Sequence, residues 1–216
     1  NAWVALGLVA AMWIVLPTLR DLYDKTRRAE SFGAGLKKLS LAYWGMQLGH
    51  LGVAVTIIGV AVVSNFEIER NVRMSPGDSV EVAGYTFTMQ ELTSRRGPNY
   101  IADGAAIEVR RGDSRRSFMM NPEKRLYIAR GMPMSQVALR PGLFRDLYVA
   151  MGEDLGDGSW AMRVQYKPFV RWLWLGALLM ATGGLLAVID RRYRRMATSR
   201  DPEENTREGT AREATA

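Results

Sequence analysis

The sequence predicts an integral membrane α-helical protein, with about three transmembrane helices in this chain and an extracytoplasmic antiparallel β domain. Three apolar segments, residues 2–19, 40–65 and 169–190, approach or exceed the length that crosses a bilayer core of roughly 30 Å as a helix. Residues 66–168 show short runs of alternating polarity separated by turn signals, which is typical of antiparallel strands. Hydrophobic residues make up 48% of the chain, and their concentration in three segments supports this fold class.

Composition narrows the possible functions. The chain contains no cysteine, which excludes disulfides, thiolate metal sites and cysteine nucleophiles. Its net charge of +7 does not indicate nucleic-acid binding, because many basic residues flank the apolar segments, where membrane topology requires them. The chain starts with Asn1 and is apolar from Ala2 onward, with no basic region before the first apolar run. We therefore expect no signal peptide and interpret the chain as a piece of a longer polytopic protein.

The first apolar segment, residues 2–19, is barely long enough to span, so truncation at its start stays open. Residues 20–39 then form a short connection rich in lysine and arginine, and basic residues in short loops mark the cytoplasmic side. Gly33 and Gly35 are expected to break any continuous helix there. This segment is interpreted as a cytoplasmic basic loop.

The second apolar segment, residues 40–65, has no charged residue and carries His50, the only histidine of the chain. At about 1.5 Å per residue, His50 lies roughly 15 Å from the start of the segment, near mid-membrane. An ionisable side chain at that depth is costly and indicates a functional site. The residue alone leaves several roles open: a hydrogen bond across a helix interface, a metal or haem ligand, or a proton relay.

Small residues form a ridge along the same segment. Spacings of three and four place them on one helix face, where they allow another helix or a flat cofactor to approach the backbone closely. The ridge consists of Ala42, Gly45, Gly49, Gly52, Thr56 and Gly59. His50 follows Gly49 directly, so we expect its side chain beside the ridge.

The β domain, residues 66–168, is expected to be a sandwich or a small barrel, and the pattern does not choose between them. Strands are predicted at residues 79–82, 85–93, 100–110, 117–120, 126–129, 135–139, 147–151 and 160–166. The domain lacks histidine and cysteine and shows no phosphate loop or metal-ligand spacing, so its catalytic residues stay unknown. The pair Glu153 and Asp154 lies in a turn-like run, which favours solvated turn chemistry over acid–base catalysis.

The third segment, residues 169–190, is predicted to return the chain to the cytoplasm. Trp172 and Trp174 form an interfacial aromatic belt, and a run of arginines follows the segment. Residues 191–216 are predicted to be a basic, disordered cytoplasmic tail. The predicted topology has the N-terminus and the β domain outside.

Five stretches of the chain resemble a known family. They read WGMQLGHLGVAVTIIG, EIERNVRMSPGDS, FRDLYVAMGEDL, YKPFVRWLWLG and GGLLAVIDRRYRR, and they cover roughly residues 36–195 in order. Together they resemble the C-terminal part of the CcmF and NrfE family of cytochrome c biogenesis haem lyases. The resemblance implies a bacterial inner-membrane protein that receives haem from the chaperone CcmE. It also implies that the haem is joined to the CxxCH motif of apocytochrome c, presented with CcmH-type thiol proteins.

The resemblance further implies a permanent haem b held between two transmembrane histidines. His50, in the GHLG motif, matches the second of these and is the expected axial ligand of the haem iron. The family's tryptophan-rich segment, its two flanking histidines and the first transmembrane haem histidine do not occur in this sequence. We therefore expect the second ligand to come from a segment outside it, and the chain to be either a fragment or one product of a split protein that is not catalytic alone.

Two other classes of function compete with this interpretation. One is a membrane-anchored periplasmic β module that binds a partner, with His50 used only in helix packing. The other is a transporter subunit in which His50 relays protons. A pigment spectrum separates them, because only the haem interpretation predicts a coloured protein. Beyond the protein partners, membrane lipid is expected to contact the chain, and nucleic acid is not.

Overall fold

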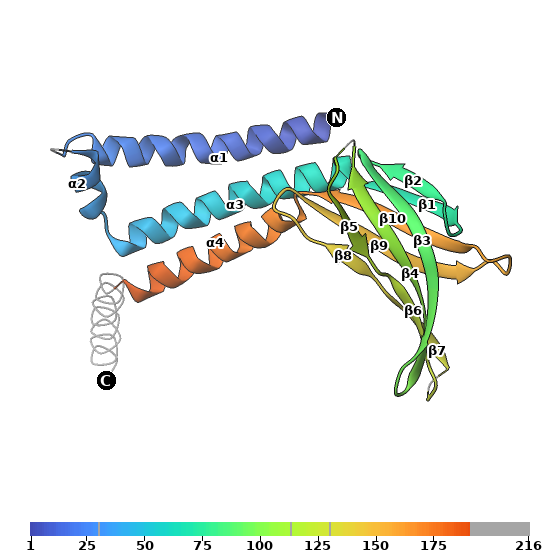
Figure 1. Cartoon of the computed structure of the whole chain (residues 1–216). Coiled ribbons are helices and arrows are strands. Elements are labelled where there is room, and N and C mark those ends of the chain that lie inside the picture. Colours follow the sequence, from blue (N-terminus) through green and yellow to red (C-terminus); the bar gives the residue numbers. More distant parts are fainter. Residues whose placement is uncertain (30, 113, 130, 191–216) are drawn as a thin grey trace, which may run out of the picture. The chain divides into compact units, whose positions relative to one another are not determined.

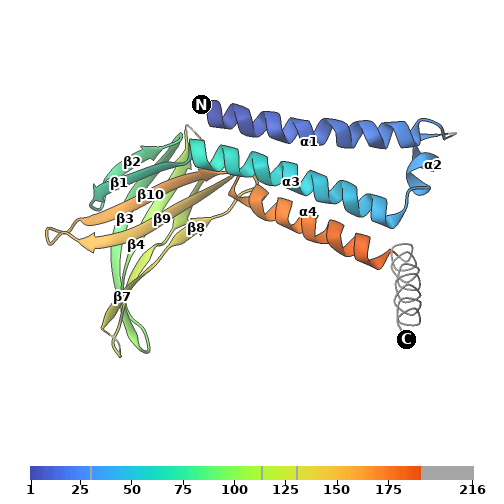
Figure 2. The same ribbon diagram turned by 180° about the vertical axis from the view of Figure 1, so that it is seen from behind.

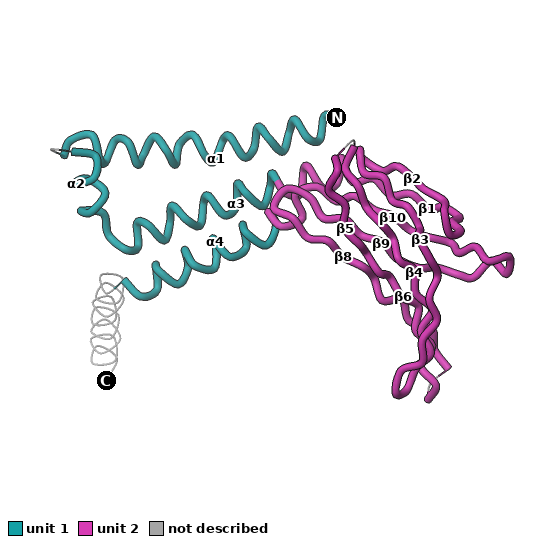
Figure 3. Tube along the Cα trace, viewed as in Figure 1, with its two compact units in different colours: residues 1–58, 173–216 teal, residues 59–172 magenta. Residues whose placement is uncertain are grey.

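The computed structural model describes residues 1–29, 31–112, 114–129 and 131–190 (Figure 1). They divide into two compact units (Figure 3). Unit 1 comprises residues 1–58 and 173–216, described as far as residue 190, and unit 2 comprises residues 59–172. The predicted tail, residues 191–216, lies outside the described residues.

Unit 1 is helical, and three of its helices are long and apolar enough to cross a membrane: α1 (Ala2–Thr26), α3 (Leu41–Phe66) and α4 (Val170–Ile189). A short helix, α2 (Phe32–Lys37), connects α1 to α3. The last residues of α3 and the first of α4 belong to unit 2, so each of these helices continues from one unit into the other. The three candidate spans confirm the helical part of the predicted fold class.

The predicted loop over residues 20–39 is wrong in its secondary structure, because most of it is helical. α1 continues through the charged residues to Thr26, supported by i,i+4 ion pairs from Arg20 to Asp24 and from Lys25 to Asp21. α2 then contains both glycines that were expected to break a helix. The Ser31 side chain accepts a hydrogen bond from the Ala34 amide at 3.2 Å and so caps the helix start.

Unit 2 is a β-sandwich of two antiparallel sheets, which decides the choice that the sequence left open. The four-stranded sheet has the order β1 (Ile68–Met74), β10 (Trp160–Pro168), β9 (Arg145–Asp154), β8 (Ala138–Arg140). The six-stranded sheet has the order β2 (Ser79–Val82), β3 (Tyr85–Arg96), β4 (Tyr100–Arg111), β6 (Glu123–Tyr127), β7 (Met132–Gln136), with β5 (Ser117–Met120) also paired to β4.

The core of the sandwich follows from the two-residue period of its strands. In β3, Tyr85, Phe87 and Met89 are buried, while Thr86 and Thr88 between them point to the other face. The register between β3 and β4 shifts after Met89, where an irregularity re-aims the rest of the strand. The facing sheet contributes Leu147, Val149, Met151, Met162 and Val164 to the same core.

The predicted strands differ most from the structure at three places. β1 was not predicted, because Arg70 stands between Ile68 and Val72 and interrupts the alternation. The strand expected at residues 126–129 begins earlier, at Glu123. The strand expected at residues 135–139 is two short strands, β7 and β8, which belong to different sheets.

Candidate functional site

The glycine ridge of α3 packs against α4 within unit 1, and the two helices lie side by side in both views (Figures 1 and 2). A Cβ atom on Gly45 would stand 2.5 Å from the carbonyl oxygen of Gly183. A Cβ atom on Gly52 would stand 2.7 Å from the carbonyl oxygen of Gly176. Such contacts allow no side chain, so glycine is required on both helices. Gly45 and Gly52 of the ridge are therefore in contact with α4, whereas a Cβ atom on Gly49, next to His50, would meet nothing within 4 Å.

One hydrogen bond ties the far ends of this helix pair. The Ala42 amide, in the first turn of α3, donates to Oδ2 of Asp190 at 2.7 Å. Asp190 directly follows α4, so the bond joins residues far apart in the sequence. A carboxylate at a helix N-terminus also interacts favourably with the helix dipole.

His50 lies on a different face of α3 from the ridge. Its side chain is exposed, together with those of Met46, Val53 and Val60, which lie at helical spacing from it on the same face. No hydrogen bond or ion pair joins the imidazole to any residue in the described part of the chain. On a helix long and apolar enough to cross a membrane, an unbonded imidazole exposed on an apolar face is costly, so its exposure points to an external partner.

Met180 lies on another helix, α4, from which a methionine could in principle supply a second ligand to an iron. In the structure its Cγ and amide nitrogen stand 2.7 and 2.8 Å from where a Cβ of Gly52 would be. Met180 thus packs into the α3–α4 ridge, whereas His50 faces away from it. Within the described ranges, no group of three or more histidine, cysteine or acidic side chains could hold a metal ion.

The haem that the resemblance implies can be tested against these residues. Haem is flat and apolar, and it takes a neutral imidazole on one face of its iron. The face around His50 offers an available imidazole between the apolar side chains of Met46 and Val53. The described residues therefore fit the role of one axial ligand and the surface around it, and they supply one imidazole only.

A polar cluster joins α1 to α3 and was missed in the sequence. The Tyr43 hydroxyl donates to Oδ2 of Asp21 at 2.7 Å, and the Gln47 amide donates to the same oxygen at 3.1 Å. Lys25 lies 3.6 Å from Asp21 and 4.1 Å from the centre of the Tyr43 ring. The available signal was the buried pair Tyr43 and Gln47, one helical turn apart in an otherwise apolar helix.

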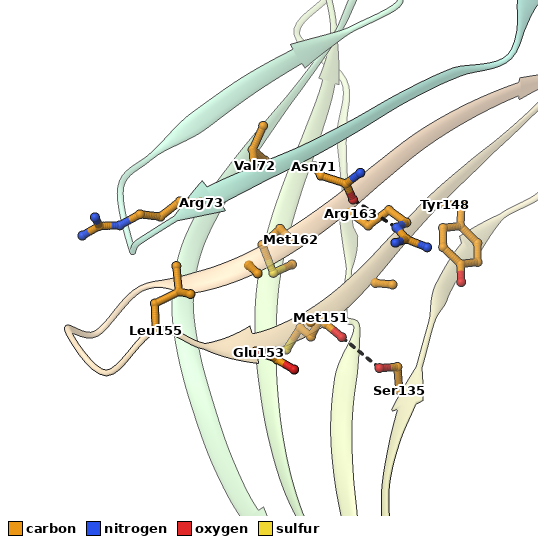
Figure 4. Close-up of a pocket in the computed structure, with 13 residues that line it drawn as sticks. Asn71, Val72, Arg73, Ser135, Tyr148, Met151, Glu153, Leu155, Met162 and Arg163 are labelled. Atoms are coloured by element: carbon orange, nitrogen blue, oxygen red, sulfur yellow. Dashed lines mark hydrogen bonds between the residues drawn. The ribbon is translucent and has the colours of Figure 1, made fainter.

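A groove of unit 2 lies over the outer face of the four-stranded sheet and has a volume of about 590 Å³ (Figure 4). Its polar side chains are bonded to neighbouring groups: Arg163 donates to Oδ1 of Asn71 at 3.0 Å, and Ser135 donates to the Met151 carbonyl at 2.9 Å. The lining residues contain no nucleophile paired with a base. The groove therefore does not indicate catalysis.

Several charged side chains on the sandwich form ion pairs with each other. Glu123 lies 2.6 Å from Arg95 and 2.9 Å from Arg125. Burial raises the pKa of Glu123, but hydrogen bonds from Arg125 and Arg95 outweigh it and hold that pKa below its usual value. The hydroxyl of Ser159 similarly lowers the pKa of Asp157. These paired groups stabilise the domain.

The sandwich matches a known protein family. Residues 65–168 match the family described as the CcmF C-terminal beta-sandwich. A solved structure named Cytochrome c Heme Lyase CcmF is similar with a TM-score of 0.57, covering 86% of this chain and 34% of that chain at 19% sequence identity. At this identity the structural similarity supports the fold.

Sequence relatives cover more than the sandwich. The chain is 47% identical over 193 residues to the cytochrome c-type biogenesis protein CcmF of Pseudomonas aeruginosa, covering 89% of this chain and 29% of that protein. It is 43% identical over 194 residues to CcmF of Escherichia coli, covering 90% and 29%. It is 35% identical over 188 residues to NrfE of Haemophilus influenzae, covering 87% and 27%. The chain thus spans less than a third of the length of these curated relatives.

Proposed function

The chain belongs to the CcmF family of cytochrome c-type biogenesis proteins, and we propose that it acts as the C-terminal portion of a haem lyase. In this proposal the assembled protein takes haem from the chaperone CcmE. It attaches the haem to the CxxCH motif of apocytochrome c, with CcmH-type proteins presenting the thiols. The relatives are cytochrome c-type biogenesis proteins and the similar structure is a cytochrome c haem lyase, which supports this activity.

The membrane arrangement is part of the proposal. The three apolar helices cross the bacterial inner membrane, and the sandwich lies on the periplasmic side. Basic residues in the segment between α1 and α3 support a cytoplasmic position for α2, which puts the opposite end of α3 outside. Lipid surrounds the exposed apolar faces of the spans.

His50 is the axial ligand of a haem b in this proposal, and one observation carries the assignment. Its imidazole is exposed on an apolar face of a candidate membrane helix and has no bonding partner in the described residues. With two imidazoles, a b-type haem supplies a low-spin centre that can carry an electron. His50 would hold the haem iron from α3, and a histidine from outside this chain would supply the second ligand.

Absorption spectra test this assignment. The chain alone is expected to bind haem weakly, or as a high-spin five-coordinate species, because it has one histidine and no cysteine. Co-expression with the remaining part of the Pseudomonas aeruginosa relative is expected to give a low-spin spectrum. A stable low-spin haem in the chain alone would contradict the assignment. A colourless assembled protein would favour an anchored binding module or a proton-relaying transporter subunit.

A further inference from the structure

We propose that one end of the sandwich is a docking surface for the headgroups of anionic phospholipids. This membrane-docking end consists of the apolar pair Leu143 and Phe144 and of the arginines Arg111, Arg115, Arg116 and Arg140. The docking surface follows from the geometry of unit 2 and from the candidate spans, and it does not depend on haem binding. It also gives a role to these four arginines, which the proposed function leaves unused.

Strand register gathers these residues where the chain joins the spans. β1 starts beside the end of β10, with Ile68 opposite Tyr166. β10 ends beside the start of β9, with Pro168 opposite Arg145. Since α3 ends at Phe66 and α4 starts at Val170, this end of the four-stranded sheet is the one connected to both helices.

The apolar pair lies in the β8–β9 loop at this same end. Leu143 is 59% exposed and Phe144 is 55% exposed. The Phe144 ring lies 5.7 Å from that of Phe169 and 6.2 Å from that of Trp172, measured between ring centres. Phe169 directly precedes α4 and Trp172 lies in its first turn, so the loop lies where that candidate span begins.

The loop is held in place although its apolar side chains are exposed. The Phe144 carbonyl accepts a hydrogen bond from the Phe169 amide at 3.0 Å. Asp146 accepts one from the Gly142 amide at 2.9 Å and lies 3.6 Å from Arg171. A fixed loop that presents leucine and phenylalanine outward exposes apolar area that water does not favour. Aromatic residues beside the end of a membrane span are typical of the bilayer interface.

Arg111, Arg115 and Arg116 reach this end from the six-stranded sheet and its loop to β5, whereas Arg140 belongs to β8 of the four-stranded sheet. Tyr85 pairs in register with Arg111, and its hydroxyl accepts a hydrogen bond from Arg145 at 2.8 Å, so β4 ends at the docking end. Arg115 and Arg116 follow in the loop to β5. The Arg140 guanidinium lies 4.3 Å from the centre of the Phe118 ring in β5, which brings β8 and β5 together.

The charge of this end is positive among the described residues. Its carboxylates are already paired, Asp146 with Arg171 and Glu67 with Lys167. The four cluster arginines form no ion pair with a carboxylate in the described ranges, and Asp113 lies outside them. Arginines beside exposed apolar side chains match the phosphates and acyl boundary of an anionic bilayer. Covalent connection to two spans keeps this surface near the membrane, which favours lipid over a soluble partner.

Depth-dependent quenching tests the proposal on the full chain in nanodiscs. Because the chain has no cysteine, Leu143→Cys accepts a single environment-sensitive fluorophore. Leu155→Cys is the matched control, since Leu155 is 48% exposed in the β9–β10 loop at the opposite end of the sheet. Lipids carrying a nitroxide are expected to quench the label at position 143 about twofold and the control hardly at all. Aqueous iodide is expected to show the reverse order.

A charge-reversal pair tests the arginines. Adding phosphatidylglycerol to phosphatidylcholine nanodiscs should increase lipid quenching at position 143, and Arg116→Glu should remove about half of that increase. Arg96→Glu, at the other end of the six-stranded sheet, should leave the increase unchanged. If Leu143→Cys does not fold, the label at Leu139→Cys in β8, also exposed, takes its place.

Two results would overturn the proposal. Iodide quenching at position 143 equal to that at position 155 would show a surface in water. A label shielded from both iodide and lipid would show that protein covers the docking end, either another part of the chain or a second copy.

Discussion

A polar side chain in unit 2 and one in unit 1 differ in whether they have a bonding partner. In unit 2, the Glu123 carboxylate is paired with Arg95 and Arg125. In the helices of unit 1, the imidazole of His50 has no partner among the described residues, although its surroundings are apolar. Because a bonded polar group stabilises a fold and an unbonded one in an apolar segment is costly, Glu123 is expected to stabilise the sandwich and His50 is the expected site of chemistry on α3.

Replacing His50 should have the largest effect. His50→Ala is expected to abolish the low-spin haem spectrum of the assembled protein and the attachment of haem to cytochrome c. Met46→Leu changes a neighbour on the same exposed face and should leave both intact. Pigment spectra and the yield of mature cytochrome c measure the two effects. Normal cytochrome assembly in the His50→Ala variant would contradict the role of His50 that separates the two units.

A cavity in the sandwich core should lower the stability of unit 2 and leave the helices unchanged. Phe87 is fully buried, so Phe87→Ala should lower the free energy of unfolding of the sandwich by about 3–5 kcal/mol. Leu126→Ala, at an exposed position, should cost far less. Below the new melting temperature, the haem spectrum of the assembled protein should be unchanged. Its loss would show that unit 2 takes part in holding the haem.

Adding one methyl group to the ridge should have a smaller effect in unit 1. Gly52→Ala forces a Cβ against the Gly176 backbone, which cannot yield as a flexible side chain can, and should destabilise the helix pair by about 1–3 kcal/mol. Gly184→Ala is the control, because nothing lies within 4 Å of its added Cβ. Thermal loss of helical circular dichroism in nanodiscs compares the two variants. Equal melting temperatures would contradict the packing of α3 on α4.

Acidification should give the smallest effect, in the sandwich. Folding lowers the pKa of Glu123 from its ordinary value of 4.5, so its stabilisation is complete above that value and is lost as the pH falls through the lowered pKa. Glu123→Gln should remove roughly 0.5–1 kcal/mol at neutral pH. It should also flatten the fall in melting temperature below pH 4.5. An unchanged acid profile would mean that this carboxylate does not stabilise the domain.

Much of the sandwich could be predicted from local pattern. β3 and β4 contain alternating stretches and are joined by a Gly97-Pro98-Asn99 turn, so hydrophobic period and turn chemistry agree. β1 could not be found in this way, because Arg70 interrupts its alternation and its pairing with β10 joins residues nearly a hundred positions apart. The α2 helix depends on a cap and on packing against Thr26, which outweigh the low propensity of its glycines.

His50 could be predicted as the candidate residue from the sequence, but the side chains that surround it could not. A lone histidine in a charge-free apolar segment is visible in the sequence. The face of α3 on which His50 is left exposed depends on which helix packs against the ridge. That helix is α4, which lies more than a hundred residues later in the sequence. The cluster of Asp21, Tyr43 and Gln47 likewise needs two helices brought together before it exists.

The hydrogen bond from the Ala42 amide to Asp190 fixes the vertical offset between α3 and α4. A displacement of α3 along α4 by one helical turn, about 5.4 Å, would place the Asp190 carboxylate beside apolar side chains and misalign the facing glycines. The helix pair therefore has one permitted offset and moves through the bilayer as a single body. His50 lies about 12 Å along α3 from Ala42, so its depth follows that of the whole pair. Bilayer thickness, which shifts or tilts such a pair, thereby sets how far the imidazole lies from either membrane surface.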